Sequence, residues 1–148
     1  MINGPNLSEG EIYYVRENTP ITIFLSKKTD NIETASFCTE QILPGNGIAT
    51  YKHLNEDEIF HFTSGTGVFV IDDQEMTILP CTVAFVPRGI WHGLRNTGTE
   101  LLIFSFGYSP AGFEDFFCQI GALKGLPFQA KSKEEIVHIA RKNGMIYK

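Results

Sequence analysis

Hydrophobic residues between positions 11 and 106 occur in short runs of four to six residues, separated by turn-forming residues. The runs are rich in β-branched and aromatic side chains, which favour strands. Turn residues such as 72–74 and 96–98 separate them at spacings typical of an all-β sandwich or barrel. The pattern predicts an all-β fold whose strands include Ile21–Leu25, Ala35–Cys38, Glu58–Phe62, Val68–Ile71, Met76–Leu79, Val83–Val86 and Leu101–Phe106.

Helical periodicity begins only after this β-rich region. Ser109 is expected to cap a helix that has Pro110 at its first position. Four apolar residues then recur at helical spacing before Gly121, namely Phe113, Phe116, Phe117 and Ile120. We expect this stripe to pack on the barrel. A cofactor-binding box built from these phenylalanines is the alternative, and plain core packing is favoured over it.

A second C-terminal helix is indicated by Ser132 and Glu135, which are spaced as a capping box. Its apolar face carries Ile136, Ile139 and Ala140, and the helix is expected to end near Gly144. No repeat, linker or low-complexity segment divides the chain. We therefore expect one domain over residues 1–148, with a barrel at about 11–107 and a helical extension over 109–148 that packs on it.

Charge and hydropathy exclude two classes of partner. The 148 residues contain twelve basic and seventeen acidic side chains, for a net charge of −5, and Lys and Arg form no run. Nucleic acid is therefore not an expected partner, because phosphate binding needs a basic stripe. No apolar run approaches the roughly 20 residues of a membrane span, so no membrane association is expected either. A cytoplasmic location is the default.

The three cysteines, Cys38, Cys81 and Cys118, are odd in number and far apart. This spacing lacks both a Cys-x-x-Cys pair and the even set of a secreted disulfide framework. We expect three reduced thiols that are largely buried.

Candidate chemistry is concentrated in two stretches of the β-rich region. In the first, Tyr51 and His53 lie two residues apart and so share one face of a strand. Glu58 follows a charged turn and opens the next strand. If the two strands form a hairpin, Glu58 lies opposite the pair at cross-strand distance. Gly45 and Gly65 mark the ends of this unit, where the turns need conformational freedom.

The second stretch runs from Pro87 to Asn96. Pro87 and Gly89 are expected to form a turn, and His92 enters the strand that follows it. The Asn96 side chain is expected to fix the end of that strand through hydrogen bonds to a loop. A single such His is more often an ordinary, partly buried residue, and only its combination with His53 and Glu58 indicates one metal-binding site.

These two stretches resemble the two signature motifs of the cupin superfamily. The wider match, which includes 57–60, 108–117 and the C-terminal helix, is similar to single-domain cupins of the quercetin-dioxygenase-like type. The resemblance implies a double-stranded β-helix, or jelly roll, with a metal-centred cavity, and often a homodimer. It also implies His53, Glu58 and His92 as metal ligands. The sequence departs from the family pattern at Tyr51, which replaces the usual first His, and at Cys81, which stands where Gly is usual.

Two His and one carboxylate form a ligand set that suits Fe(II) with open positions for substrate or O₂. We therefore expect one divalent metal ion, with Fe favoured and Mn, Ni and Zn as alternatives. The metal-free alternative is a barrel that has lost a ligand and only binds a molecule in its cavity. Tyr51 is expected to be a neutral phenol that faces the cavity and orients a water or passes a proton to substrate, as the candidate catalytic residue.

Other residues of interest have plainer interpretations. His61 is placed by strand alternation on the face opposite Glu58, so it is not an expected ligand. His138 lies in the C-terminal helix and is expected to be solvated. Six aromatic residues are expected mainly as core, with cavity lining as the alternative, namely Phe60, Phe62, Phe85, Trp91, Phe104 and Phe106.

The sequence thus supports two classes of function. The favoured one is a metal-dependent enzyme acting on a small organic molecule, preferably a dioxygenase of the quercetin-dioxygenase-like type. Metal-dependent isomerisation or cyclisation uses the same three ligands and stays open. The other class is a non-catalytic cupin that binds or senses a small ligand. Fold and motif likeness alone give only a weak basis for the reaction type.

Overall fold

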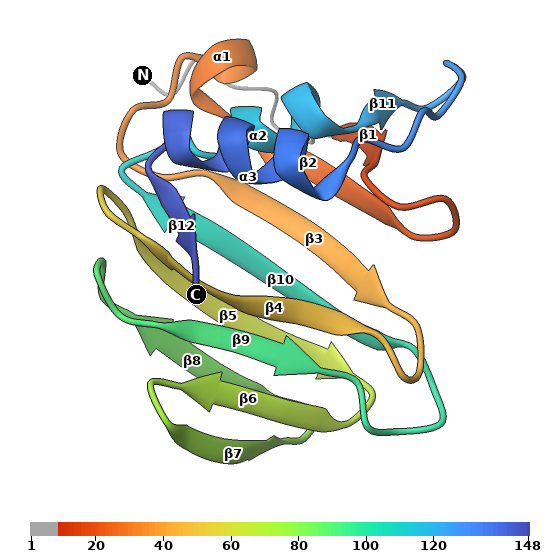
Figure 1. The fold of residues 1–148 in the computed structure, drawn as a ribbon, viewed down its shortest axis with the longest axis vertical. Coiled ribbons are helices and arrows are strands. Elements are labelled where there is room, and N and C mark those ends of the chain that lie inside the picture. The colour runs from red at the N-terminus through yellow and green to blue at the C-terminus, as the bar shows by residue number, and fades with distance from the viewer. Residues whose placement is uncertain (1–8) are drawn as a thin grey trace.

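Residues 9–148, which the computed structural model describes, form two antiparallel β-sheets that face each other across an aromatic core (Figure 1). The larger sheet contains, in spatial order, β11 (Ala122–Leu123), β1 (Glu11–Tyr14), β2 (Pro20–Leu25), β3 (Phe37–Ile42), β10 (Leu102–Ser109), β5 (Asp57–Ser64) and β8 (Thr82–Val86). The smaller sheet contains β12 (Met145–Tyr147), β4 (Gly47–His53), β9 (His92–Arg95), β6 (Gly67–Ile71) and β7 (Gln74–Ile78). This is the predicted all-β, jelly-roll architecture.

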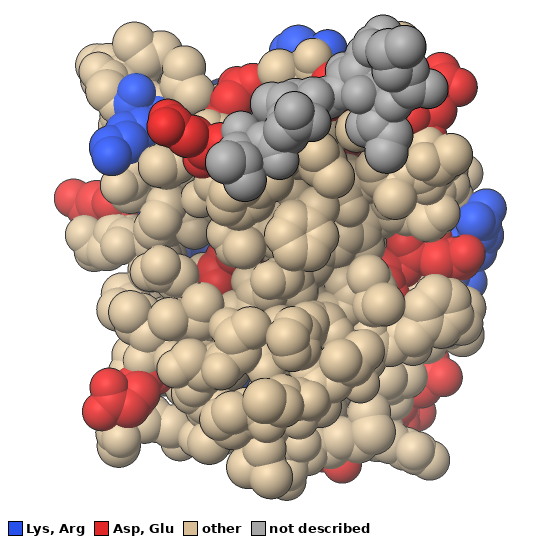
Figure 2. All heavy atoms as spheres, turned by 180° about the vertical axis from the view of Figure 1, so that it is seen from behind, with Lys and Arg blue, Asp and Glu red and all other residues tan. Residues whose placement is uncertain are grey.

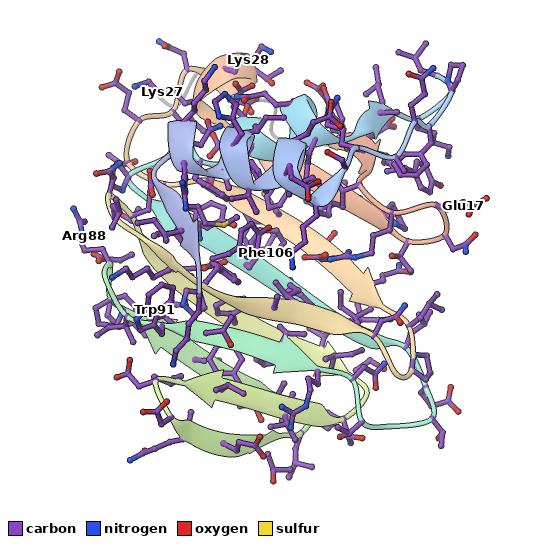
Figure 3. All side chains as sticks on the ribbon, in the orientation of Figure 1. Glu17, Lys27, Lys28, Arg88, Trp91 and Phe106 are labelled. Atoms are coloured by element: carbon purple, nitrogen blue, oxygen red, sulfur yellow. The ribbon has the colours of Figure 1, made fainter. Side chains whose placement is uncertain are left out.

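Strand alternation fills the space between the sheets. On β5, Phe60 and Phe62 are buried while Ile59 and His61 face outward, because successive side chains of a strand point to opposite faces. Phe104 and Phe106 on β10 complete the same aromatic layer. Figure 3 shows Phe106 between the two sheets, whereas Arg88 and Trp91 lie at the margin of the molecule. The prediction that His61 points away from the interior is confirmed.

Phe85 does not belong to this core, although it was predicted as core or cavity lining. Its side chain is 60% exposed on the outer face of β8, beside Val83 at 60% and Ile59 at 51%. The neighbouring residues Ala84 and Val86 take the inward positions instead. The outer face of the larger sheet shows few charged side chains in its middle (Figure 2).

The helices gather at one end of the sandwich (Figure 1): α1 (Lys27–Asp30), α2 (Asp115–Ile120) and α3 (Lys133–Lys142). The predicted capping box of α3 is present, with Ser132 and Glu135 bonded reciprocally. Phe113, Phe116 and Phe117 are buried against the barrel, as predicted. Within residues 9–148, no helix is long and apolar enough to cross a membrane.

The start of α2 differs from its prediction. Ser109 does not cap a helix, because it continues β10 and pairs with Asp57 of β5. The helix begins six residues later, at Asp115. The Glu114 side chain accepts hydrogen bonds from the backbone N–H groups of Lys27 and Gly112, which ties this segment to α1.

The cysteines only partly follow their prediction. All three are free thiols, and Cys38 is buried on β3. Cys118 is partly buried, and Cys81 is exposed. Cys81 has a φ of 70° between β7 and β8. Its position in a left-handed turn explains both its exposure and why a Gly would suit this site.

Candidate metal centre

His53, Glu58 and His92 converge in the interior although they come from two different sheets. β4 and β9 pair in the smaller sheet, where Tyr51 lies directly opposite His92. Glu58 belongs to β5 of the larger sheet and reaches the two imidazoles across the interior. The predicted hairpin between the strands of His53 and Glu58 is therefore wrong. The segment between them crosses from one sheet to the other, which brings the three side chains together from facing layers.

The loop before β9 is fixed directly to the end of β4. Gly89, with a φ of 84°, donates its backbone N–H to the carbonyl of His53 at 2.6 Å. Arg88 binds the carboxylate of Asp57 through its backbone N–H and its guanidinium. At the far end of β9, the Asn96 amide donates to the carbonyls of Ile42 and Glu100, as predicted. These contacts hold His92 in register with the other two side chains.

The spacing of the three side chains fits a single bound cation. His92 Nε2 lies 2.8 Å from Glu58 Oε2, and His53 Nε2 lies 3.2 Å from the same oxygen. One ligand atom from each residue lies within 4.8 Å of the others, and all three residues are buried. Ligands bound at about 2.1 Å to one first-row metal ion are about 3.0–3.4 Å apart in octahedral or tetrahedral geometry. The two nitrogen–oxygen distances are close to this range.

The protonation of His92 also favours a cation at this point. His92 Nδ1 lies 2.9 Å from the carbonyl of Ile90, which can only accept a hydrogen bond, so Nδ1 carries the proton. In the neutral ring Nε2 is then an acceptor that faces the carboxylate of Glu58, another acceptor. Two acceptors at this distance need a proton or a metal ion between them.

His53 has a carboxylate on its Nδ1 side, at a distance too long for a hydrogen bond. Its Nδ1 lies 3.7 Å from Oε2 of Glu56, and both residues are buried. Among residues 9–148, both ring nitrogens of His53 and this Glu56 oxygen lack a hydrogen-bond partner. Phe113 and Tyr108 pack edge-on against the ring at centroid distances of 4.2 and 4.9 Å. The unpaired Nε2 is thus held toward Glu58 and is available as a ligand.

Tyr51 faces the same interior and contacts the carboxylate of Glu58. Its hydroxyl donates to Oε2 at 3.2 Å, with Oε1 at 3.4 Å, and its ring lies 4.3 Å from that of His92. Burial, and then the charge of Glu58, raise the pKa of the phenol well above its usual value. The structure therefore places a neutral phenol beside the candidate ligands, where the usual first His of the family is replaced.

Opposing effects act on Glu58 itself. Burial alone raises the pKa of its carboxyl, but the imidazoles of His53 and His92 outweigh this, and the pKa lies below its ordinary value. Glu58 is therefore an anionic group that offers its charge to a cation. The two other histidines lie outside the cluster, since His61 is exposed on β5 and His138 is exposed on α3.

Residues 38–106, which contain all three candidate ligands, match the family model of the cupin domain. This part of the chain is a cupin domain. Over 80 residues the chain is 31% identical to an oxalate-binding protein of Thermotoga maritima. That match covers 54% of this chain and 66% of the relative, which is just under two thirds of its length.

Solved structures share the cupin fold over most of the chain. A predicted oxalate decarboxylase from Thermotoga maritima superposes with a TM-score of 0.60 at 24% identity, covering 74% of this chain and 99% of that one. KdgF from Halomonas sp. gives a TM-score of 0.61 at 14% identity, covering 72% and 94%. At these identities the likeness establishes the fold.

The cupin interior holds polar residues that the motif spacing did not reveal. Glu40 on β3 points inward between Cys38 and Ile42 and is 3% exposed. Arg16, which follows β1, donates from Nη1 to Glu40 Oε1 at 2.5 Å. The available sequence signal was a carboxylate two residues from each of two apolar residues, Cys38 and Ile42, on one face of a strand. Glu56 was visible only as one member of a charged turn.

Proposed function

We propose that this protein is a metal-dependent cupin enzyme that acts on a small organic molecule, and that its reaction is a dioxygenation at Fe(II). The convergence of His53, Glu58 and His92 is the observation that carries the proposal. This ligand set matches the two-His, one-carboxylate arrangement of non-haem iron oxygenases. The ion, when bound, would supply Lewis-acid and redox chemistry at positions that the protein leaves open.

The protein's own residues would prepare the substrate for this chemistry. Phe60 and Phe113 pack against the imidazoles of His92 and His53, and Phe106 packs on Phe60, so apolar rings would surround a substrate bound here. Tyr51 holds a proton next to Glu58, where a neutral phenol can donate a hydrogen bond to a substrate oxygen or exchange a proton with it. The catalytic role of Tyr51 is part of this proposal.

Metal analysis and oxygen consumption together test the proposed function. Untagged protein, purified without chelator, is expected to contain a stoichiometric divalent metal ion, and Fe(II) added to metal-free protein is expected to bind. Nitric oxide then serves as a stand-in for O₂ at an open iron position. Protein that binds neither Fe(II) nor any other divalent ion, in the absence of competing ligands, would exclude a metal-dependent enzyme.

A non-catalytic oxalate-binding role is the second candidate. It is supported by the name of the Thermotoga maritima relative, to which the chain is 31% identical over 80 residues. Calorimetric titration of the metal-loaded protein with oxalate separates the two. Tight oxalate binding without oxygen consumption or oxalate turnover favours the binder.

We also propose that the protein acts as a homodimer. Three large apolar side chains, Ile59, Val83 and Phe85, are each more than half exposed on the outer face of β5 and β8. Contiguous apolar surface of this kind commonly marks an interface. β8 is also an edge strand of the larger sheet among the described residues, and exposed edges need cover.

A further inference from the structure

A partly buried ion pair lies in the barrel interior, apart from the candidate metal ligands. Glu40 is almost fully buried, while the side chain of Arg16 is 34% exposed. The guanidinium therefore connects the interior with solvent. The hydrogen bond between them uses one carboxylate oxygen and one guanidinium N–H. Among residues 9–148, this is the one side-chain hydrogen bond that Glu40 and Arg16 form, so Glu40 Oε2 and the other N–H groups of Arg16 stay available.

The ion pair shares one cavity with Glu58 of the candidate metal site, whereas His53 and His92 do not line it. Arg16, Glu40, Tyr51 and Glu58 all line a cavity of about 80 Å³, together with Tyr147. The rest of the wall is apolar and aromatic, and it includes the buried phenylalanines Phe113, Phe116 and Phe117 at the helical end. Such a volume has room for several water-sized groups. The cavity thus suits a small ligand with an apolar body and two separate polar contacts.

Stability alone does not explain the pair. Removing the Glu40 carboxylate from water costs several kcal/mol, and apolar residues of similar size often replace a buried pair without loss. Pairing of β3 with β2 and β10 sets Glu40 opposite Ile21 and Phe104, where an apolar side chain would complete the core. A carboxylate on the wall of a cavity, with only one of its oxygens hydrogen-bonded among residues 9–148, indicates a contact with a ligand.

We propose that Arg16 and Glu40 form the substrate-recognition site of this cavity and bind a hydroxyl group of the substrate. The hydroxyl would donate to Glu40 Oε2 and accept from an N–H of Arg16, which satisfies both partners. This inference rests on the proposed function, because it assigns the substrate class of the same cavity. That class is a small hydroxylated molecule with an apolar body and at most one negative charge.

Charge balance sets the limit on the ligand. Among the groups that line the cavity, Arg16 and a divalent ion at Glu58 would bring three positive charges, against two negative charges on Glu58 and Glu40. The buried carboxylate of Glu56 lies on the Nδ1 side of His53 and does not line the cavity. The cavity can therefore neutralise one further negative charge. A dianion such as oxalate would leave one carboxylate uncompensated in a region of low dielectric. The cavity should accordingly prefer a hydroxylated monoanion to oxalate.

The test compares molecules that differ by one hydroxyl. Calorimetric titrations with 3-hydroxybenzoate against benzoate, and with 3-hydroxybutyrate against butyrate, are run on zinc-loaded and on metal-free protein. At least one hydroxylated probe is expected to bind about tenfold more tightly than its partner, because a site built for a hydroxyl is left unpaired by the analogue that lacks it. Oxalate is expected to bind more weakly than that probe.

The double variant Arg16→Met/Glu40→Leu removes both charges at once, so that neither is left buried alone. It is expected to keep its zinc content and to lose the preference for the hydroxylated probe. The matched control, Arg95→Met/Glu75→Leu, removes an exposed ion pair and is expected to keep the preference.

Three outcomes would overturn the assignment: no hydroxyl preference in the wild type, a preference that survives in the Arg16/Glu40 double variant, or tighter binding of oxalate. A protein that shows the preference without binding metal would instead contradict only the proposed function. The metal-free titrations separate these two failures.

Discussion

Glu56 lies directly behind His53, with its Oε2 3.7 Å from the Nδ1 of the imidazole and both groups buried. His92 has a backbone carbonyl in the equivalent place. The Nε2 of each ring faces Glu58. A carboxylate or carbonyl on the far nitrogen of a metal-binding imidazole raises its basicity, and loss of such a partner commonly weakens metal binding about 10- to 100-fold. At 3.7 Å, Glu56 acts on His53 through its charge and not through a hydrogen bond.

Glu56→Gln is therefore expected to weaken Zn(II) binding by about tenfold or more while preserving the fold. The neutral amide attracts the Nδ1 proton less strongly, so Nε2 becomes a poorer ligand. Competition with a chromophoric chelator measures the affinity of the metal-free protein for Zn(II). Glu134→Gln, at an exposed position of α3, is the matched control. Equal affinities in the two variants would remove Glu56 from the site.

Replacing both candidate imidazoles should abolish metal binding. The His53→Ala/His92→Ala variant is expected to retain less than about a tenth of the wild-type metal content, because Glu58 alone is a weak monodentate site. The fold should persist, since the aromatic layer of Phe60, Phe62 and Phe104 does not depend on either imidazole. Elemental analysis and circular dichroism measure the two properties. Unchanged metal content in a folded variant would contradict the site.

Tyr51→Phe tests whether the phenol acts as a ligand or as a hydrogen-bond donor. We expect metal content to stay within about twofold of the wild type, because a neutral phenol with a raised pKa is a poor ligand for Fe(II) or Zn(II). Ligand affinity or turnover should change, since the donor to Glu58 is lost. A variant that no longer binds metal would show that the phenol is itself a ligand.

The sequence predicted the metal cluster better than it predicted the strand pairing. Residue types, their spacing and the resemblance to cupins selected His53, Glu58 and His92, and alternation along one strand correctly placed His61 on the outer face. The hairpin was wrong because strands adjacent in sequence usually pair, whereas here residues 54–56 cross between the sheets. Which strands pair depends on contacts between residues far apart in the sequence, and a local sequence pattern does not contain that information.

The lack of long-range information in a local pattern also explains the other differences between the predictions and the structure. Ser109 and Pro110 form a good local start for a helix, but pairing of Ser109 with Asp57 extends the strand instead. Phe85 is apolar, yet the inward positions of β8 belong to its neighbours. Arg16 and Glu40 are 24 residues apart and belong to no motif, so only the folded chain reveals their contact.

Glu40 should make stability depend on pH in a defined direction. Burial raises the pKa of this carboxyl above 4.5, although Arg16 opposes the effect and Glu58 adds to it. The folded state therefore binds a proton more tightly than the unfolded state. Its contribution to the free energy of unfolding is fully present below about pH 4.5 and is lost as pH rises through the raised pKa.

Glu40→Gln removes this dependence because the amide does not titrate. The difference in unfolding free energy between the variant and the wild type should shift in favour of the variant as pH rises from 4 to 8. Urea denaturation at each pH measures it. Other acidic groups, such as Glu56, cancel in the difference. A pH-independent difference would show that Glu40 titrates normally in the folded protein.

The exposed apolar face of the larger sheet predicts self-association that a single charge should disrupt. Phe85 is 60% exposed beside Val83 and Ile59, and Figure 2 shows few charges in the middle of this face. Light scattering is expected to give about twice the chain mass of 16.6 kDa for the wild type. Phe85→Glu should shift the protein to monomer, because burying an unpaired carboxylate at an apolar interface costs several kcal/mol.

Leu126→Glu is the matched control, since it alters an equally exposed apolar side chain, at 64%, in the loop before α3 and should leave the mass unchanged. A wild type that is monomeric at every concentration, or a Phe85→Glu variant that remains dimeric, would show that this face does not bind a second copy.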